Sequence, residues 1–196
     1  MDKTIRNINQ QIKDEADIIL YRQELFAILS KYGIPHITGS YALNLMTWRD
    51  LDIYIQKENM NEAEFFQLGA EINKRYHPVK MSYRNERITQ TKELPFGLYW
   101  GVYLGNERKD GWKIDIWVVD EKECRRLLEF CNDIAAKLSP LSEEFLLTIK
   151  SNCWQDPQYR RSYTSKDIYV AVLDHGITTL EEFRTYLQIK AAADMK

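Results

Sequence analysis

Apolar residues follow a helical period near the start of the chain. They recur there at steps of three, four and seven residues, at Ile5, Ile8, Ile12, Ile19, Phe26 and Leu29. This spacing predicts one or two amphipathic helices that end at Gly33. A second helical pattern covers residues 61–76, where Phe65, Phe66, Leu68 and Ile72 form the apolar face.

Other segments follow the two-residue period of strands. "DLDIYI" (50–55) alternates, and "FGLYWGVYLG" (96–105) and "WKIDIWVV" (112–119) are rich in β-favouring residues. Because Asp110-Gly111 precedes the last of these, the two runs predict a hairpin. Pro35 opposes a helix, so "IPHIT" (34–38) is expected to be extended.

The last third of the chain has only helical patterns. They cover residues 121–138, 142–154, 165–176 and 179–190. The order of these elements predicts an α+β fold, with a small mixed β-sheet, flanking helices and a C-terminal helical segment. We therefore divide the chain into a core (residues 1–120) and a helical region (residues 121–196), which we expect to be an acceptor-binding cap.

Composition narrows the functional classes. The chain has 196 residues, of which 44% are hydrophobic, and its formal net charge is −2. A general nucleic-acid binder usually carries a basic excess, so nucleic acid is an unlikely partner. Three cysteines without metal-ligand spacing favour a reducing, cytoplasmic setting. A charged N-terminus and the short uncharged stretch 34–48 predict neither a signal peptide nor a membrane span.

Charged residues interrupt two of the apolar strands. Alternation places Asp50 and Asp52 on the face opposite the apolar residues of their strand, and Asp115 on the corresponding face of the later strand. If these strands are neighbours, three carboxylates meet and repel one another unless a cation compensates them. Oxygen ligands suit Mg²⁺, and such a set can hold two ions for displacement at phosphorus.

A Gly-Ser pair precedes the carboxylates. Gly39-Ser40 opens "YALNLM", which we expect to be a short helix, and its backbone N–H groups and hydroxyl suit phosphate oxygens. An Asp-x-Asp pair alone is more often a feature of a strand edge. The ordered set of Gly-Ser, Asp-x-Asp and a later strand with a single Asp is much more specific.

This ordered set resembles the nucleotidyltransferase superfamily of the DNA polymerase β type, over residues 33–120. It is most similar to small bacterial antibiotic-modifying or uncharacterised members. The resemblance implies transfer of a nucleoside monophosphate from a nucleoside triphosphate such as ATP to an acceptor hydroxyl. It also implies that Gly39 and Ser40 hold the triphosphate and that Asp50 and Asp52 ligate Mg²⁺. Asp115 would hold a second Mg²⁺ or act as base on the acceptor.

Two basic residues lie next to this pattern. Arg49 stands where many members have a small residue, and it is either a phosphate contact or a solvated charge at the strand edge. Lys113 shares a face with Asp115 and either offsets the carboxylates or touches a phosphate. The basic stretch from Lys80 to Lys92 is expected to be a solvated loop, and the linker 159–163 is a place for an acceptor site.

Three functions are compatible with these features. The first is a Mg²⁺-dependent nucleotidyltransferase that acts on a small acceptor such as an aminoglycoside or a lincosamide. The second is a member of the same fold that modifies or neutralises a partner protein, as an antitoxin does. The third is a catalytically inactive nucleotide-binding protein. An intact set of Asp50, Asp52 and Asp115 favours the first.

Overall fold

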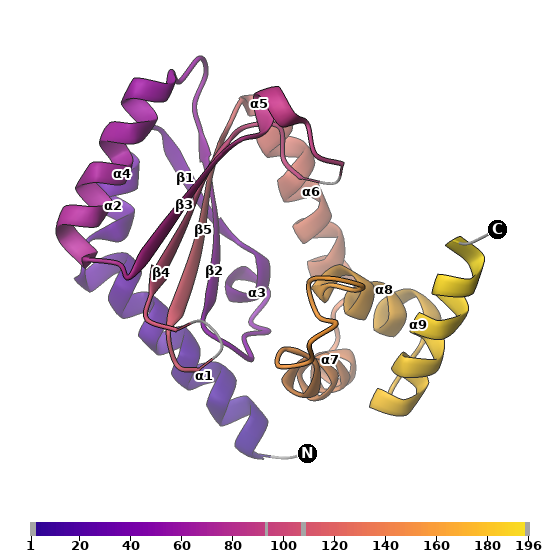
Figure 1. The fold of residues 1–196 in the computed structure, drawn as a ribbon. Coiled ribbons are helices and arrows are strands. Elements are labelled where there is room, and N and C mark those ends of the chain that lie inside the picture. Colours follow the sequence, from indigo (N-terminus) through magenta and orange to yellow (C-terminus); the bar gives the residue numbers. More distant parts are fainter. Residues whose placement is uncertain (1–2, 93, 107–108, 195–196) are drawn as a thin grey trace.

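A mixed β-sheet forms the centre of the molecule (Figure 1). The structure is a computed structural model that describes residues 3–92, 94–106 and 109–194. The strand order is β1-β2-β5-β4-β3, in which β2 and β5 are parallel and the other neighbours are antiparallel. The strands are β1 (Ile34–Thr38), β2 (Asp50–Gln56), β3 (Lys80–Asn85), β4 (Leu98–Leu104) and β5 (Trp112–Val119).

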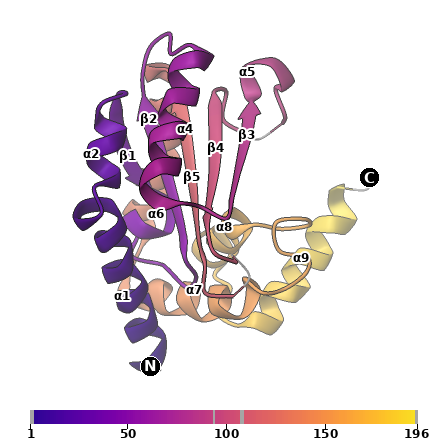
Figure 2. The same cartoon turned by 60° about the vertical axis from the view of Figure 1, so that its left-hand side comes forward.

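Helices cover both faces of this sheet (Figures 1 and 2). One face carries α1 (Lys3–Asp17), a π-helical turn (Ile18–Arg22), α2 (Leu25–Ser30) and α4 (Glu62–Tyr76). The other face carries α6 (Glu121–Lys137), followed by α7 (Pro140–Cys153), α8 (Ser165–His175) and α9 (Leu180–Asp194). Two short helices, α3 (Gly39–Ala42) and α5 (Glu86–Thr89), complete the fold. No helix of the described residues is long and apolar enough to cross a bilayer.

Local sequence signals explain where the C-terminal helices begin and end. Ser139 and Ser142 form a reciprocal cap at the start of α7, where Pro140 takes the first helical position. Thr164 caps α8, and Gly176 ends this helix in a left-handed conformation with φ of 66°. Because α7 ends at Cys153 and α8 begins at Ser165, residues 154–164 form a connection between the two helices. This connection reaches the candidate active site.

The α+β prediction is confirmed, and so is the antiparallel pairing of β4 and β5. Residues 107–108 of the connecting loop lie outside the described residues. The prediction of a loop over residues 80–92 was wrong in part, because residues 80–85 form β3 and pair with β4. The sequence of β3 is polar since this strand lies at a sheet edge. The short helix also stops at Ala42, and the chain turns at Asn44 with φ of 57°.

The molecule has two main hydrophobic clusters. The larger lies between the sheet and the helices α1, α2 and α4. The second lies among α7, α8 and α9, and includes Leu43, Leu45 and Trp48 from the connection between α3 and β2. This connection is therefore held on one side by the sheet and on the other by the helical region.

Candidate active site

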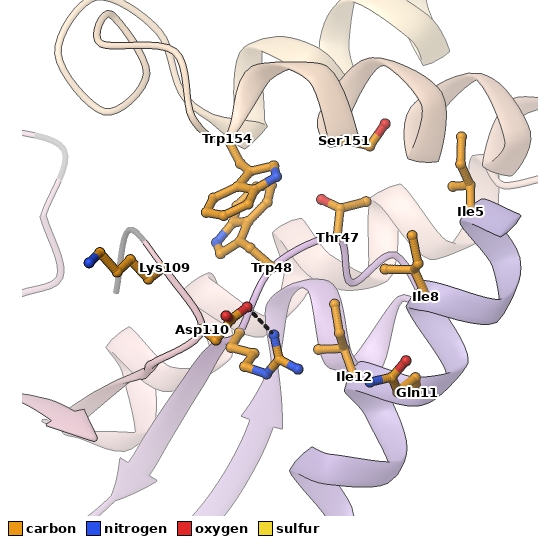
Figure 3. A pocket seen from close by; sticks show the side chains of 11 residues that line it. Ile5, Ile8, Gln11, Ile12, Thr47, Trp48, Lys109, Asp110, Ser151 and Trp154 are labelled. Carbon is orange, nitrogen blue, oxygen red and sulfur yellow. Dashed lines mark hydrogen bonds and ion pairs between the residues drawn. The ribbon is translucent and has the colours of Figure 1, made fainter. Parts of the chain in front are cut away.

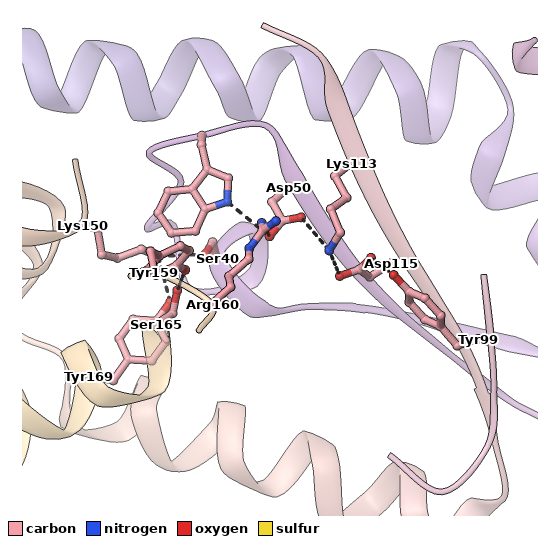
Figure 4. Close-up of polar contacts among 11 residues, drawn as sticks. Ser40, Asp50, Tyr99, Lys113, Asp115, Lys150, Tyr159, Arg160, Ser165 and Tyr169 are labelled. Atoms are coloured by element: carbon pink, nitrogen blue, oxygen red, sulfur yellow. Dashed lines mark hydrogen bonds and ion pairs between the residues drawn. The ribbon is translucent and has the colours of Figure 1, made fainter. Parts of the chain in front are cut away.

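The three predicted carboxylates lie on two adjacent parallel strands, and Figure 4 shows Asp50 and Asp115 among them. In the register of β2 and β5, Asp52 is opposite Asp115 and Asp50 is opposite Lys113. The alternating burial of β2 turns Leu51 and its apolar neighbours to the core, so the aspartates face the other way. The strand pairing therefore brings together side chains that are more than sixty residues apart in sequence.

Lys113 neutralises part of this acidic cluster. Its ammonium forms an ion pair with Asp115 and lies 3.8 Å from Asp50 Oδ1. Burial alone would lower the pKa of Lys113, but the two carboxylates outweigh burial and raise it. The Tyr99 hydroxyl, from the neighbouring strand, donates to Asp115 Oδ1 at 2.7 Å. Lys113 thus stays charged and offsets the carboxylates.

A second cation approaches from the helical region. Arg160, in the connection between α7 and α8, places Nη2 2.9 Å from Asp50 Oδ2. The Trp48 indole N–H donates to the same oxygen at 3.2 Å. Asp50 Oδ1 is buried and has no hydrogen-bond partner among the described residues. This oxygen, 3.8 Å from the Lys113 ammonium, therefore keeps lone pairs that a bound cation could use.

The surroundings of Asp52 disfavour its charged form. Burial, followed by the charges of Asp50 and Asp115, raises its pKa to about 7. Burial also raises the pKa of Asp115, although Lys113 opposes this effect. Three carboxylates face only two cations among the described groups at this site, Lys113 and Arg160, so their formal charges leave room for additional positive charge.

Gly39 lies against Asp52 because β1 pairs with β2, which places Thr38 opposite Asp52. The backbone of Gly39 has φ of 61°, and a Cβ atom here would lie 2.2 Å from Asp52 Oδ2. Both the conformation and the space require glycine. Ser40, the next residue, turns its hydroxyl to the helical region.

Lys150 connects Ser40 to the helical region. This lysine of α7 is fully buried, and its ammonium donates to Ser40 Oγ (2.8 Å), the Leu45 carbonyl (2.8 Å) and the Tyr169 hydroxyl (2.9 Å). It also lies 5.1 Å from the centre of the Trp48 ring. A buried ammonium whose three hydrogen-bond partners among the described residues are neutral oxygens lies directly beside the Gly-Ser pair, where it adds positive potential.

A pocket of about 190 Å³ opens in front of these groups. Its polar wall consists of Gly39, Ser40, Asp50 and Asp52. Its opposite wall comes from α6 and α8, with Leu127, Phe130, Cys131, Ser165, Lys166 and Tyr169. The pocket therefore joins an acidic and a partly apolar surface from the two regions of the chain.

The structure does not bring Arg49 into this pocket. Its guanidinium forms two hydrogen bonds with Glu15 of α1, at 2.6 and 2.8 Å, and lies 3.4 Å from Asp110. Arg49 lines a separate cavity between α1 and α7, of about 340 Å³, which also includes Trp154 and Ile8 (Figure 3). Arg49 thus links α1 to the start of β2.

The fold is similar to that of two solved RNA-modifying enzymes. A cytoplasmic RNA terminal U-transferase has a TM-score of 0.53 and 13% identity, and the match covers 90% of this chain and 55% of that one. Cid1, an RNA terminal uridylyl transferase, has a TM-score of 0.52 and 13% identity, with coverage of 89% and 53%. The chain has the nucleotidyltransferase fold. It spans little more than half the length of these two structures, and no family model or curated protein matches its sequence.

The donor set of this nucleotidyltransferase fold suits Mg²⁺. Three carboxylates and the Ser40 hydroxyl are hard oxygen donors, and Asp50 Oδ1 lacks a hydrogen bond. In the described part of the chain, however, no three acidic, histidine or cysteine side chains converge as a closed metal cluster. The carboxylates turn to Lys113, Arg160 and Tyr99 instead, so a bound metal requires these side chains to rearrange.

Sequence analysis therefore named six residues that the structure places together: Gly39, Ser40, Asp50, Asp52, Lys113 and Asp115. It missed Lys150, although a signal exists. Leu146, Lys150 and Cys153 share the buried face of α7, and a lysine on an apolar helical face needs a polar partner elsewhere. The linker 159–163 was named, but not the contact of Arg160 with Asp50.

Proposed function

We propose that this protein is a Mg²⁺-dependent nucleotidyltransferase that moves a nucleoside monophosphate from a nucleoside triphosphate to an acceptor hydroxyl. The observation that carries this proposal is the juxtaposition of Asp50 and Asp52 with Gly39 and Ser40 in one pocket, with Asp115 opposite Asp52 on the adjacent strand. The carboxylates suit the metal ion of a metal-bound phosphate chain. The glycine and the nearby cations suit its phosphate oxygens.

Each side chain has a role in this proposal. Asp50 and Asp52 hold Mg²⁺, and Asp115 holds a second ion or takes the proton of the acceptor hydroxyl. Gly39 lets the triphosphate approach the backbone, Ser40 contacts its oxygens, and the buried Lys150 orients the Ser40 hydroxyl and adds positive potential beside it. Bound Mg²⁺ supplies charge neutralisation at the phosphates. The acceptor oxygen forms a bond to the α-phosphorus, the bond to the bridging oxygen breaks, and pyrophosphate leaves with that electron pair.

The acceptor we propose is a small hydroxylated molecule bound between the sheet and the helices α6 and α8. The pocket is narrow and partly apolar, and the net charge of the chain is −2. An RNA 3′ end is the second candidate, because the two solved structures compared above are RNA terminal transferases. The two acceptors differ in charge, so salt dependence distinguishes them as well.

The test is a transfer assay with Mg²⁺ and each of the four ribonucleoside triphosphates labelled at the α-phosphate. Three acceptor sets are compared: aminoglycosides and lincosamides, short RNA oligonucleotides, and proteins that co-purify with the chain. We expect a mass gain of one nucleoside monophosphate on a small acceptor. Loss of an active-site carboxylate costs about 10³-fold or more in turnover, so Asp52→Asn should be inactive. Full activity of this variant would contradict the carboxylate roles, and transfer to RNA would replace the small acceptor.

A further inference from the structure

The connection between α7 and α8 holds Arg160 in a defined position. The Arg160 N–H donates to the Tyr163 carbonyl at 2.7 Å, and Tyr159 and Tyr163 form a β-bridge. Both tyrosines are buried, and the Tyr159 hydroxyl hydrogen-bonds Ser165 Oγ at 2.7 Å. Arg160 itself has φ of 66°, which is rare for a residue with a side chain. The surrounding contacts, rather than local preference, therefore determine this conformation.

The same contacts fix the loop relative to Asp50. The Tyr159 ring packs edge-to-face on Trp48 at 5.2 Å, and the Trp48 indole donates to Asp50 Oδ2. The Arg160 guanidinium lies 5.8 Å from the centre of the Tyr159 ring and reaches the same Asp50 oxygen (Figure 4). The Arg160 guanidinium and the Trp48 indole thus converge on one carboxylate oxygen, and the two buried tyrosines hold the loop that carries Arg160.

Arg160 and a metal ion compete for this carboxylate. Like charges on one carboxylate repel strongly in a partly buried site, so Mg²⁺ bound through the Oδ1 atom of Asp50, which has no hydrogen bond, repels the guanidinium from Oδ2. The displaced guanidinium then needs another anion within reach of the same loop. A triphosphate that arrives with Mg²⁺ is such an anion, and its oxygens match the planar donors of arginine.

From this geometry we infer that Arg160 is an exchangeable counter-ion that couples the binding of metal to the binding of nucleotide. Without nucleotide, Arg160 occupies Asp50 and opposes the metal. With nucleotide, Arg160 transfers to the phosphates, and the metal takes its place on Asp50. The inference rests on the proposed function, because it requires that a metal–nucleotide complex binds in this pocket. Arg160 is a positioning residue in this scheme, since it governs which ligands enter together.

Binding measurements test this coupling without turnover. Mn²⁺ binding alone is followed by electron paramagnetic resonance, and binding of α,β-methylene-ATP with and without Mn²⁺ by calorimetry. In the wild type we expect each ligand to strengthen the other by about tenfold or more. In Arg160→Gln, Mn²⁺ alone should bind about threefold to tenfold more tightly, and the coupling should fall to about threefold or less.

Two variants make the result specific. Arg161→Gln removes the same charge from the next, exposed position of the loop, and should behave as the wild type. Arg160→Lys keeps the charge but loses the planar pair of donors, so Mn²⁺ alone should bind as in the wild type while the coupling weakens.

The outcomes also separate this inference from the proposed function. Equal behaviour of Arg160→Gln and Arg161→Gln, or weaker Mn²⁺ binding in Arg160→Gln, would overturn the role of Arg160 while the wild type still binds the metal–nucleotide complex. A wild-type protein that binds neither Mn²⁺ nor the nucleotide analogue would overturn both.

Discussion

The two sides of the candidate active site are built in different ways. The acidic side, with Asp50, Asp52 and Asp115, is positioned by the hydrogen-bonded register of two adjacent strands. The cationic side, with Lys150 and Arg160, depends on how α7 and the connection to α8 pack on Trp48 and its neighbours. The acidic side is thus part of the sheet, whereas the cationic side exists only once two hydrophobic clusters have docked.

This difference has a functional meaning. A metal needs donors at fixed distances, and a β-sheet is a rigid support for them. A phosphate chain needs cations that approach from the opposite wall, and helices that pack on a separate cluster are able to adjust. The comparison predicts that substitutions on the cationic side change ligand binding together with the contact between the two regions, while those on the acidic side act locally.

The largest effect is expected from Lys150→Met, which keeps the apolar stem and removes the ammonium. The Leu45 carbonyl loses its buried donor, so the free energy of unfolding should fall by about 2 kcal/mol. Affinity for Mg²⁺ and a triphosphate, measured by calorimetry, should fall by about tenfold, because Ser40 loses the ammonium that orients it. Lys137→Met, on the surface of α6, is the control: it removes only an exposed ion pair with Asp174, should cost less than about 1 kcal/mol and should leave nucleotide affinity unchanged. Unchanged nucleotide affinity in Lys150→Met would make the cationic side purely structural.

Gly39→Ala tests the closest contact on the acidic side. The added Cβ atom meets Asp52 at 2.2 Å in a left-handed backbone, so Asp52 must move. The free energy of unfolding should fall by about 2 kcal/mol, and metal affinity should fall with it. Gly176→Ala has the same strain, with φ of 66°, but no atom within 4 Å. This control should lose only about 1 kcal/mol by chemical denaturation, and an equal loss in both variants would contradict the contact.

Asp52→Asn tests the charge repulsion on the acidic side. Because burial and two neighbouring carboxylates raise the pKa of Asp52 to about 7, the folded state binds a proton that the unfolded state has released. Its contribution to stability is therefore present near pH 4 and is lost as the pH rises to 7. Without metal, Asp52→Asn should be more stable than the wild type at pH 8 by on the order of 1 kcal/mol.

Urea unfolding at several pH values checks this expectation. The difference between Asp52→Asn and the wild type should shrink toward pH 4, where Asp52 is protonated. Asp133→Asn, on the exposed face of α6, is the matched control and should show no such trend. A destabilised Asp52→Asn at pH 8 would mean that the cations compensate the carboxylates completely.

The smallest effect is expected from Arg49→Gln. Loss of its two hydrogen bonds to Glu15 should lower the free energy of unfolding by about 1 kcal/mol. Nucleotide affinity should stay unchanged, because Arg49 lies at a different cavity. Glu15→Gln and the double variant complete a double-mutant cycle, in which the two losses should not add. A tenfold loss of nucleotide affinity in Arg49→Gln would return Arg49 to the phosphate site.

Sequence patterns predicted most strands of the sheet. Alternation identified β2 and β5 because buried strands need apolar residues at every second position, and a charge on the other face is then conspicuous. The edge strand β3 was missed since it is partly exposed and its residues are polar. The length of α3 was also misjudged, because its last turn depends on the burial of Leu43 and Leu45 beneath α7 and α8.

The sequence by itself determined that Asp50 and Asp52 share one face of their strand and that Asp115 lies opposite the apolar face of its own, because the two-residue period of a strand operates whatever packs on it. The pairing of β2 with β5, which brings the three together, was decided by the tertiary structure. Only the tertiary structure decided that Arg49 pairs with Glu15 of α1 and that Lys150 and Arg160 lie at the site. Contacts of the last two span about 110 residues of chain. A long cationic side chain reaches in many directions from its backbone, so its partner is chosen by the packing of the helices and not by local sequence.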